Sequence, residues 1–276
     1  MSLLRERVSM SYIGRIIVCF VIYVNISYGL NPLQNVSSPE FRALAEDTYH
    51  KVLPCVKSNP HLTDKNINFR FPDDAEAHYQ LILEKTAPYR LAPIHEYAGY
   101  SGPWLENRFI AEFMQRPLFS FRGLIPLYIQ WIDTQILRGR HFDYILSELN
   151  ALLRPDVLYV TVSQGDVGLG KIGVKHPNIF VFSAGGFGHI PLPLIKGELP
   201  YIPPPPVYAR DIGFFGTIQQ QHSTRENVLR LIEKEAHRWE LTVQLGGGPK
   251  WKHDMEHSKF NLAPRGYGRN SFRFAE

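Results

Sequence analysis

Apolar side chains in the first half of the chain recur mostly at the spacing of an α-helix. One segment, over 39–53, carries its apolar side chains on a single side, which predicts an amphipathic helix; these side chains are Phe41, Leu44, Ala45 and Tyr49. Capping residues, prolines and the same spacing predict further helices over 73–85, from 103 onward, over 126–137 and over 142–153. Residues 66–71 instead alternate apolar and polar side chains, and this pattern predicts a strand.

The second half of the chain has short apolar runs separated by helical segments. The runs at 157–162 and 178–182 are rich in β-branched and aromatic residues and apolar on both faces, as in a buried parallel sheet. Further strands are predicted over 212–215, 241–245 and 259–263. Ser223-Thr-Arg-Glu226 has the pattern of a capping box, which opens a helix between two of these strands. The alternation of strands and helices predicts an α/β fold.

Four consecutive prolines, 203–206, interrupt this alternation. A run of prolines is extended and stiff, so we expect it to act as a linker. We therefore predict an N-terminal α/β lobe over 30–202 and a C-terminal lobe over 207–276. A nucleotide-binding α/β unit normally has more strands than 207–276 offers, so we expect this second lobe to be incomplete.

Residues 1–29 have the pattern of a targeting segment. Arg5, Arg7 and Arg15 precede an apolar run over 16–24, and Ser27 and Gly29 follow it, as in a signal peptide cleaved after Gly29. The longer span over 12–30 leaves a signal anchor as an alternative, because about 20 residues cross a bilayer as a helix. A third alternative is a buried segment of a soluble protein. Either targeting form places the body in the secretory lumen, where Asn35-Val36-Ser37 would be a glycan acceptor.

Composition places the chain among ordinary globular proteins. Of its 276 residues 44% are hydrophobic and 20% are charged, which excludes disordered, collagen-like and coiled-coil classes. The formal net charge is +4, and the targeting segment contributes half of it. Such a small surplus excludes a broad nucleic-acid-binding surface, so any anion site must come from local clustering of basic residues.

Two motifs point only weakly to chemistry. Residues 165–171 fit the phosphate-loop spacing GxxxxGK, but Ile172 takes the place of the magnesium-binding Ser or Thr, so we expect these glycines to shape a turn. His253 and His257 lie four residues apart, but Asp254 stands where a zinc protease has Glu. We expect a solvated helix face there and no metal ion.

The last fifteen residues, 262–276, combine several features that attract an anion. Three arginines follow the last predicted strand, and the glycines between them let backbone N–H groups approach a ligand. Ser271 can then begin a helix whose positive end favours phosphate, and a carboxylate one turn later could bind ribose hydroxyls. These features predict a diphosphate site; the alternative is a solvated loop whose arginines pair with carboxylates elsewhere. The predicted binding residues are Arg265, Gly266, Gly268, Arg269, Ser271, Arg273 and Glu276.

At these residues the chain resembles the exostosin family of glycosyltransferases. The resemblance is carried by SKFNLAPRGYGRNSFRFAE at 258–276, and by WLENRF at 104–109, GHIPLP at 188–193 and RDIGFFG at 210–216. It implies a glycosyltransferase fold of the B type, with two Rossmann-like lobes that bind a UDP-sugar donor and a glycan acceptor. It also implies a single-pass Golgi protein with a lumenal body and an inverting reaction without an essential metal. Members often work in complexes with related transferases.

Carried over to this chain, the resemblance gives residues their roles. Arg265, Arg269 and Arg273 would bind the diphosphate, and Glu276 the ribose. Many family members place an Asp-His pair after the strand at 157–162, whereas this chain continues Ser163-Gln-Gly-Asp166. The candidates for the general base are Asp166, for which a turn residue is the alternative interpretation, and His189. The implied activity is hexosyl or glucuronosyl transfer. The alternatives are a non-catalytic protein that binds a glycan or stabilises a partner, and an incomplete, inactive product.

Overall fold

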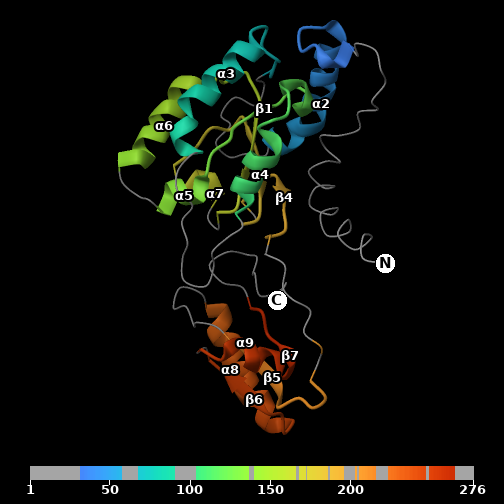
Figure 1. The fold of residues 1–276 in the computed structure, drawn as a ribbon, viewed down its shortest axis with the longest axis vertical. Helices are drawn as coiled ribbons and strands as arrows, with labels where there is room; N and C mark the ends of the chain where they lie inside the picture. The colour runs from blue at the N-terminus through green and yellow to red at the C-terminus, as the bar shows by residue number, and fades with distance from the viewer. Residues whose placement is uncertain are drawn as a thin grey trace. The chain divides into compact units, whose positions relative to one another are not determined.

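The protein is described from a computed structural model, which places residues 32–57, 68–90, 104–136, 140–165, 168–171, 173–185, 187–195, 203, 205–215, 223–246 and 249–264. The chain divides into two compact units, one up to Pro193 and the other from Leu194 (Figure 1). Each unit contains one parallel sheet, of four and three strands respectively. The predicted α/β class and the predicted parallel pairing of its strands are confirmed.

The first unit surrounds a sheet of strand order β1-β2-β3-β4. The strands are β1 (Ile125–Pro126), β2 (Tyr159–Ser163), β3 (Ile179–Ser183) and β4 (Ile190–Pro191). The α-helices are α2 (Pro39–Lys57), α3 (Ala75–Lys85), α4 (Leu105–Phe113), α5 (Trp131–Ile136), α6 (Arg140–Leu152) and α7 (Gly168–Lys171). Three 3-10 turns accompany them, η1 (Pro32–Gln34), η2 (Ala87–Tyr89) and η3 (Leu118–Phe121).

The core of this unit lies on both faces of β2 and β3, in which every residue is buried. Figure 1 shows α2 and α6 on opposite sides of the sheet. Helix α2 packs inward through a stripe at helical spacing, which comprises Phe41, Ala45, Tyr49, Val52 and Val56. Continuous apolar runs therefore become central strands because helices cover both of their faces.

Two predicted elements differ from the structure. The strand predicted over 66–71 is wrong for the described residues 68–71, which join no sheet; there Arg70 N–H donates to the Asp156 carbonyl at 2.9 Å. The helix predicted over 126–137 begins only at Trp131, because Pro126 belongs to β1 and pairs with Val160. Short apolar runs fit a buried strand as well as a helix, and pairing with β2 decides between them here.

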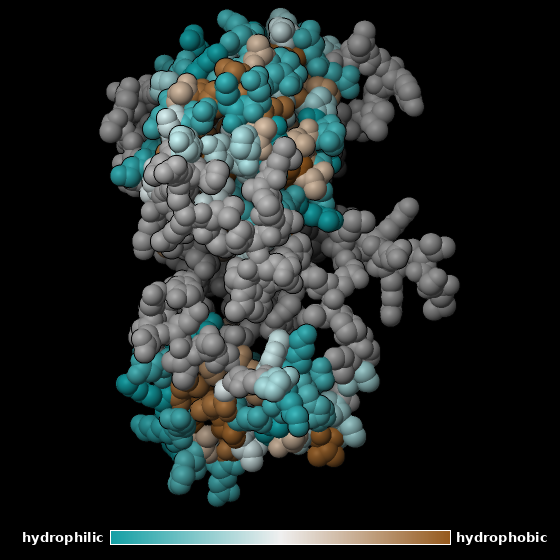
Figure 2. Space-filling model, turned by 60° about the vertical axis from the view of Figure 1, so that its left-hand side comes forward, coloured by the Kyte–Doolittle hydropathy of each residue, from teal (hydrophilic) through white to brown (hydrophobic). Residues whose placement is uncertain are grey.

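The second unit has a sheet of order β6-β5-β7. Its elements are β5 (Arg210–Phe214), α8 (Ser223–Arg238), β6 (Val243–Leu245), α9 (Trp251–Glu256) and β7 (Ser258–Asn261). The three predicted strands and the predicted helix are thus confirmed within a few residues. Several large apolar side chains of this unit are exposed, and Figure 2 shows apolar areas on its surface. They include Val207, Leu231, Trp239 and Phe260.

The predicted targeting segment lies outside the described residues. Within the described part of the chain, no helix is both long and apolar enough to cross a bilayer. Asn35, the predicted glycan acceptor, is exposed between η1 and α2, and its Oδ1 accepts a hydrogen bond from Ser37 N–H at 3.0 Å. The acceptor side chain is therefore open to solvent.

Thr161 joins three elements of the first unit at its core. Its buried hydroxyl donates to the Leu127 carbonyl at 2.8 Å and accepts from Trp131 Nε1–H at 3.0 Å. We expect Thr161→Val to lower the free energy of unfolding by about 2–3 kcal/mol, because it leaves both partners buried and unpaired. Urea unfolding followed by tryptophan fluorescence measures this loss. Thr161→Ser, which keeps the hydroxyl, is the control; an equal loss in both variants would assign the effect to packing instead.

Candidate functional site

Most of the predicted site residues lie outside the described residues. These are Asp166, Arg265, Gly266, Gly268, Arg269, Ser271, Arg273 and Glu276. The structure does describe His189 and the strands that lead to the other residues. It therefore shows from which edge of each sheet the predicted segments leave.

All three strands of the second sheet are parallel, so their carboxyl ends meet at one edge. In the sequence, β6 is followed by three glycines, 246–248, and β7 by residues 262–264 and then Arg265. The inter-strand hydrogen bonding continues one residue past the ends of β6 and β7. Gly246 N–H donates to Phe214 O and Leu262 N–H donates to Gly213 O, each at 2.9 Å. Ligands of open α/β sheets bind at this edge, and glycine lets the backbone approach them.

The backbone at Gly246 suits such an approach. Its φ of +119° lies in the region that favours glycine, and no described atom lies within 4 Å of the position that a Cβ would take. A ligand could therefore approach this stretch of backbone without displacing any side chain of the described residues.

Asp211 fixes the strands at the opposite end of the same sheet. One carboxylate oxygen pairs with Lys259 Nζ of β7 at 2.5 Å, and the other accepts Thr242 N–H at 2.9 Å and the Thr242 hydroxyl at 2.7 Å. The Lys259 hydrogen bond, followed by those from Thr242, holds the pKa of Asp211 well below its usual range. A single ionised side chain thus connects β5 with β7 and with the residue that precedes β6.

The carboxyl edge of the first sheet is polar and buried. Ser163 and Ser183 end β2 and β3, and each hydroxyl accepts a backbone N–H two residues further on. Gln164 follows β2 and is 4% exposed. Glu106 of α4 and Asp133 of α5 are fully buried in the same unit. Buried carboxyl groups are rare unless paired, which makes this cluster a candidate site.

Glu106 is a strongly perturbed acid of this cluster. The pKa of its carboxyl is raised to about 8, chiefly by burial and in addition by the nearby Asp133, while backbone hydrogen bonds, first among them the one from Gln164 N–H at 2.8 Å, oppose the shift. Its second oxygen, Oε2, forms no hydrogen bond with the described residues. The sequence interpretation assigned no role to Glu106 or Asp133. The available signal was that Glu106 lies three residues before Phe109, on the apolar side of α4.

His189 lies beside the middle of β3. Val181 N–H donates to its Nδ1 at 2.9 Å, and its ring stacks on Phe180 with 5.0 Å between centroids. The neutral ring therefore carries its proton on Nε2, since Nδ1 serves as the acceptor. Burial lowers the pKa of His189 below its ordinary value, which favours this neutral form. In this geometry its one lone pair is occupied, so the ring can donate a hydrogen bond but is poorly placed to remove a proton.

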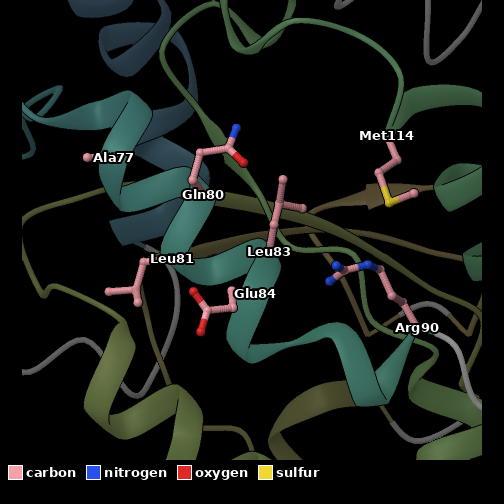
Figure 3. Close-up of a pocket in the computed structure, with 7 residues that line it drawn as sticks. All are labelled: Ala77, Gln80, Leu81, Leu83, Glu84, Arg90 and Met114. Carbon is pink, nitrogen blue, oxygen red and sulfur yellow. The ribbon is translucent and has the colours of Figure 1, made fainter.

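A separate hollow of about 730 Å³ opens on the outside of the first unit (Figure 3). Helix α3 lines most of it, together with Arg90 and Met114, and Arg90 donates to Thr86 Oγ1 at 3.2 Å. None of the residues predicted to act in catalysis or binding lines this hollow, and we assign no role to it.

The two weak motifs take simple local forms. After β2 the described part of 165–171 forms only the four-residue helix α7, rather than the long helix that follows a phosphate loop. The His253 and His257 rings stack on α9 with 4.0 Å between centroids, and His257 Nδ1 donates to the His253 carbonyl. Among the described residues, no group of three or more potential ligand side chains is arranged to hold a metal ion.

Comparisons with known proteins add no identification. No family model matches the chain, and neither the curated proteins nor the solved structures give a significant match.

Proposed function

We propose that this protein is a glycosyltransferase that moves a sugar from a UDP-sugar to a glycan acceptor, with its two units acting as Rossmann-like lobes of the B type. The observation that carries the proposal is the shared carboxyl edge of the second sheet. Glycines follow β6 there, and the segment containing Arg265, Arg269 and Arg273 follows β7. Backbone N–H groups and guanidinium groups are both suited to binding a diphosphate.

The reaction that fits these groups is a single displacement. The acceptor hydroxyl oxygen attacks the anomeric carbon, the bond from that carbon to the diphosphate oxygen breaks, and the configuration inverts. The leaving UDP gains negative charge, which the arginines stabilise without a metal ion. The hydroxyl proton passes to a carboxylate, and we propose Asp166, because the lone pair of His189 is already held by Val181 N–H.

The proposal extends to location and partners. The basic and apolar start of the chain supports a lumenal Golgi protein, anchored through residues 12–30 if that segment is not cleaved. The exposed acceptor Asn35 is compatible with such a compartment. We propose a related transferase as its partner in a complex.

We expect the full chain, incubated with a panel of UDP-sugars and oligosaccharide acceptors, to transfer one sugar in the presence of excess EDTA. Asp166→Asn is expected to lower kcat by about 100-fold or more, the usual contribution of a general base. His189→Gln should lower kcat less than tenfold, since Gln can still accept the Val181 hydrogen bond. The absence of both transfer and hydrolysis with every donor would contradict the transferase proposal. Equal losses in the two variants would contradict the choice of base.

A further inference from the structure

Two hydrogen bonds tie the exit of β2 to the start of α4. Gln164 N–H donates to Glu106 Oε1 at 2.8 Å, and Leu105 N–H donates to Gln164 Oε1 at 2.9 Å. The partners lie almost sixty residues apart in the sequence, so each bond is a tertiary contact. Leu105 is the first residue of α4, and its N–H is one of those a helix cannot satisfy internally. Gln164 therefore caps α4 while Glu106 holds the backbone of Gln164.

Stability alone does not account for an acid at this place. Glu106 is fully buried, its Oε2 has no hydrogen-bond partner among the described residues, and Asp133 is buried close enough to disfavour its ionisation. An apolar side chain of similar volume would avoid the cost of burying a carboxyl group. What an apolar residue could not supply is the acceptor for Gln164 N–H.

The position of these two hydrogen bonds at the end of β2 bears on the proposed reaction. They hold the residue directly after the end of β2, where chains of parallel α/β sheets turn toward bound ligands. Asp166, the base in the proposed reaction, lies two residues further along. The clamp therefore acts on the strand exit that leads into the sequence containing the proposed base.

We propose that Glu106 is a positioning residue, which with Gln164 clamps the exit of β2, the strand that leads into the sequence containing the proposed base Asp166. The clamp itself is a feature of this chain's fold, while its effect on catalysis rests on the proposed function. In the clamp Glu106 serves only as a hydrogen-bond acceptor, since Gln164 N–H donates to its Oε1 and the other hydrogen bond is accepted by Gln164 Oε1. The amide oxygen of glutamine supplies the same acceptor.

Hydrogen exchange of the full chain, read on peptides that cover 159–165 and 179–185, tests the clamp directly. We expect Glu106→Ala to speed exchange of the Gln164 amide at least tenfold and to leave β3 slow, while Glu106→Gln stays within about threefold of wild type. Glu112→Ala is the matched control, since Glu112 lies on the same helix but is half exposed and pairs with Arg108. Unchanged exchange in Glu106→Ala, faster exchange in Glu106→Gln, or equal acceleration in β3 would each overturn the clamp.

Kinetics then test the consequence for Asp166. We expect Glu106→Ala to lower kcat at least tenfold and leave KM for the UDP-sugar within about twofold, and Glu106→Gln to restore kcat. A purely structural role would lower the yield of folded protein without this split, and a kcat unaffected by Glu106→Ala would overturn the positioning role. A wild-type chain that transfers no sugar would overturn the proposed function, whereas the exchange result would still decide for or against the clamp.

Discussion

Replacing Gly123 by alanine is expected to destabilise the first unit by about 2–5 kcal/mol, a large part of the about 5–15 kcal/mol by which folded domains are stable. Gly123 has a φ of +96°, which costs an alanine about 1–2 kcal/mol. Its Cβ would also lie 2.4 Å from Ala45 Cβ and 2.9 Å from Ala45 Cα, so α2 would have to move. Overpacking of this kind typically adds about 1–3 kcal/mol. Tyr49, whose hydroxyl donates to the Gly123 carbonyl at 2.6 Å, lies on the same helix and would move with it.

The chain offers a matched control for this change. Gly173 has a similar φ of +100°, but a Cβ there would meet only the flexible end of Leu146 at 3.2 Å. Gly173→Ala should therefore cost only about 1–2 kcal/mol. Adding Ala45→Gly to Gly123→Ala should recover part of the loss. Urea unfolding, followed by the fluorescence of the buried Trp104 and Trp131, measures the stability of all three variants. Equal losses in Gly123→Ala and Gly173→Ala would show that the close approach of α2 to Gly123 does not contribute.

The second large effect is a dependence of stability on pH through Glu106. Its pKa is raised from an ordinary value of 4.5 to about 8 in the folded chain, chiefly by burial. Between these values the folded state keeps a proton that the unfolded state releases, so the contribution of Glu106 is fully present below pH 4.5 and is lost as pH rises through 8. At 1.36 kcal/mol per pKa unit, the loss amounts to at most about 5 kcal/mol.

Glu106→Gln isolates this effect because glutamine does not ionise. We expect the difference in unfolding free energy, variant minus wild type, to rise steadily between pH 5 and 8 and to level off above pH 8, as measured by urea unfolding in steps of one pH unit. His78 acts in the opposite direction, since burial lowers its pKa and its contribution falls as pH drops below about 6.5, but it is common to both proteins and cancels. A difference that stays constant with pH would show that Glu106 is not held protonated.

Local pattern was enough to predict most elements of the fold. The apolar stripe that begins at Phe41 has helical spacing over enough residues to indicate a helix, and the β-branched and aromatic residues of the runs at β2 and β3 favour strands there. The alternation at 66–71 is equally regular, yet the described residues 68–71 join no sheet. A strand exists only where a neighbour supplies its hydrogen bonds, and that neighbour cannot be seen in a local window.

The candidate site likewise has parts that the sequence predicts and parts that it does not. The arginines and glycines of 262–276 are contiguous, so their chemistry could be predicted from sequence, and the structure adds that β7 leads to them at the carboxyl edge of a parallel sheet. Glu106 and Gln164 meet only through the packing of α4 against β2, which no local pattern records. The role of His189 depends on which ring nitrogen accepts Val181 N–H, and that too is a tertiary property.

Calorimetric titration of the full chain with UDP tests the central claim most directly. We predict saturable binding with a Kd between about 10 μM and 1 mM, a range typical of nucleotide-binding enzymes. Arg265→Ala should weaken it at least tenfold, because one charge-assisted contact to phosphate is worth about 1.5–3 kcal/mol. Arg230→Ala is the control, since Arg230 is exposed on α8 and pairs with Glu226. No binding of UDP by the wild-type chain, or equal affinity in Arg265→Ala, would contradict the account.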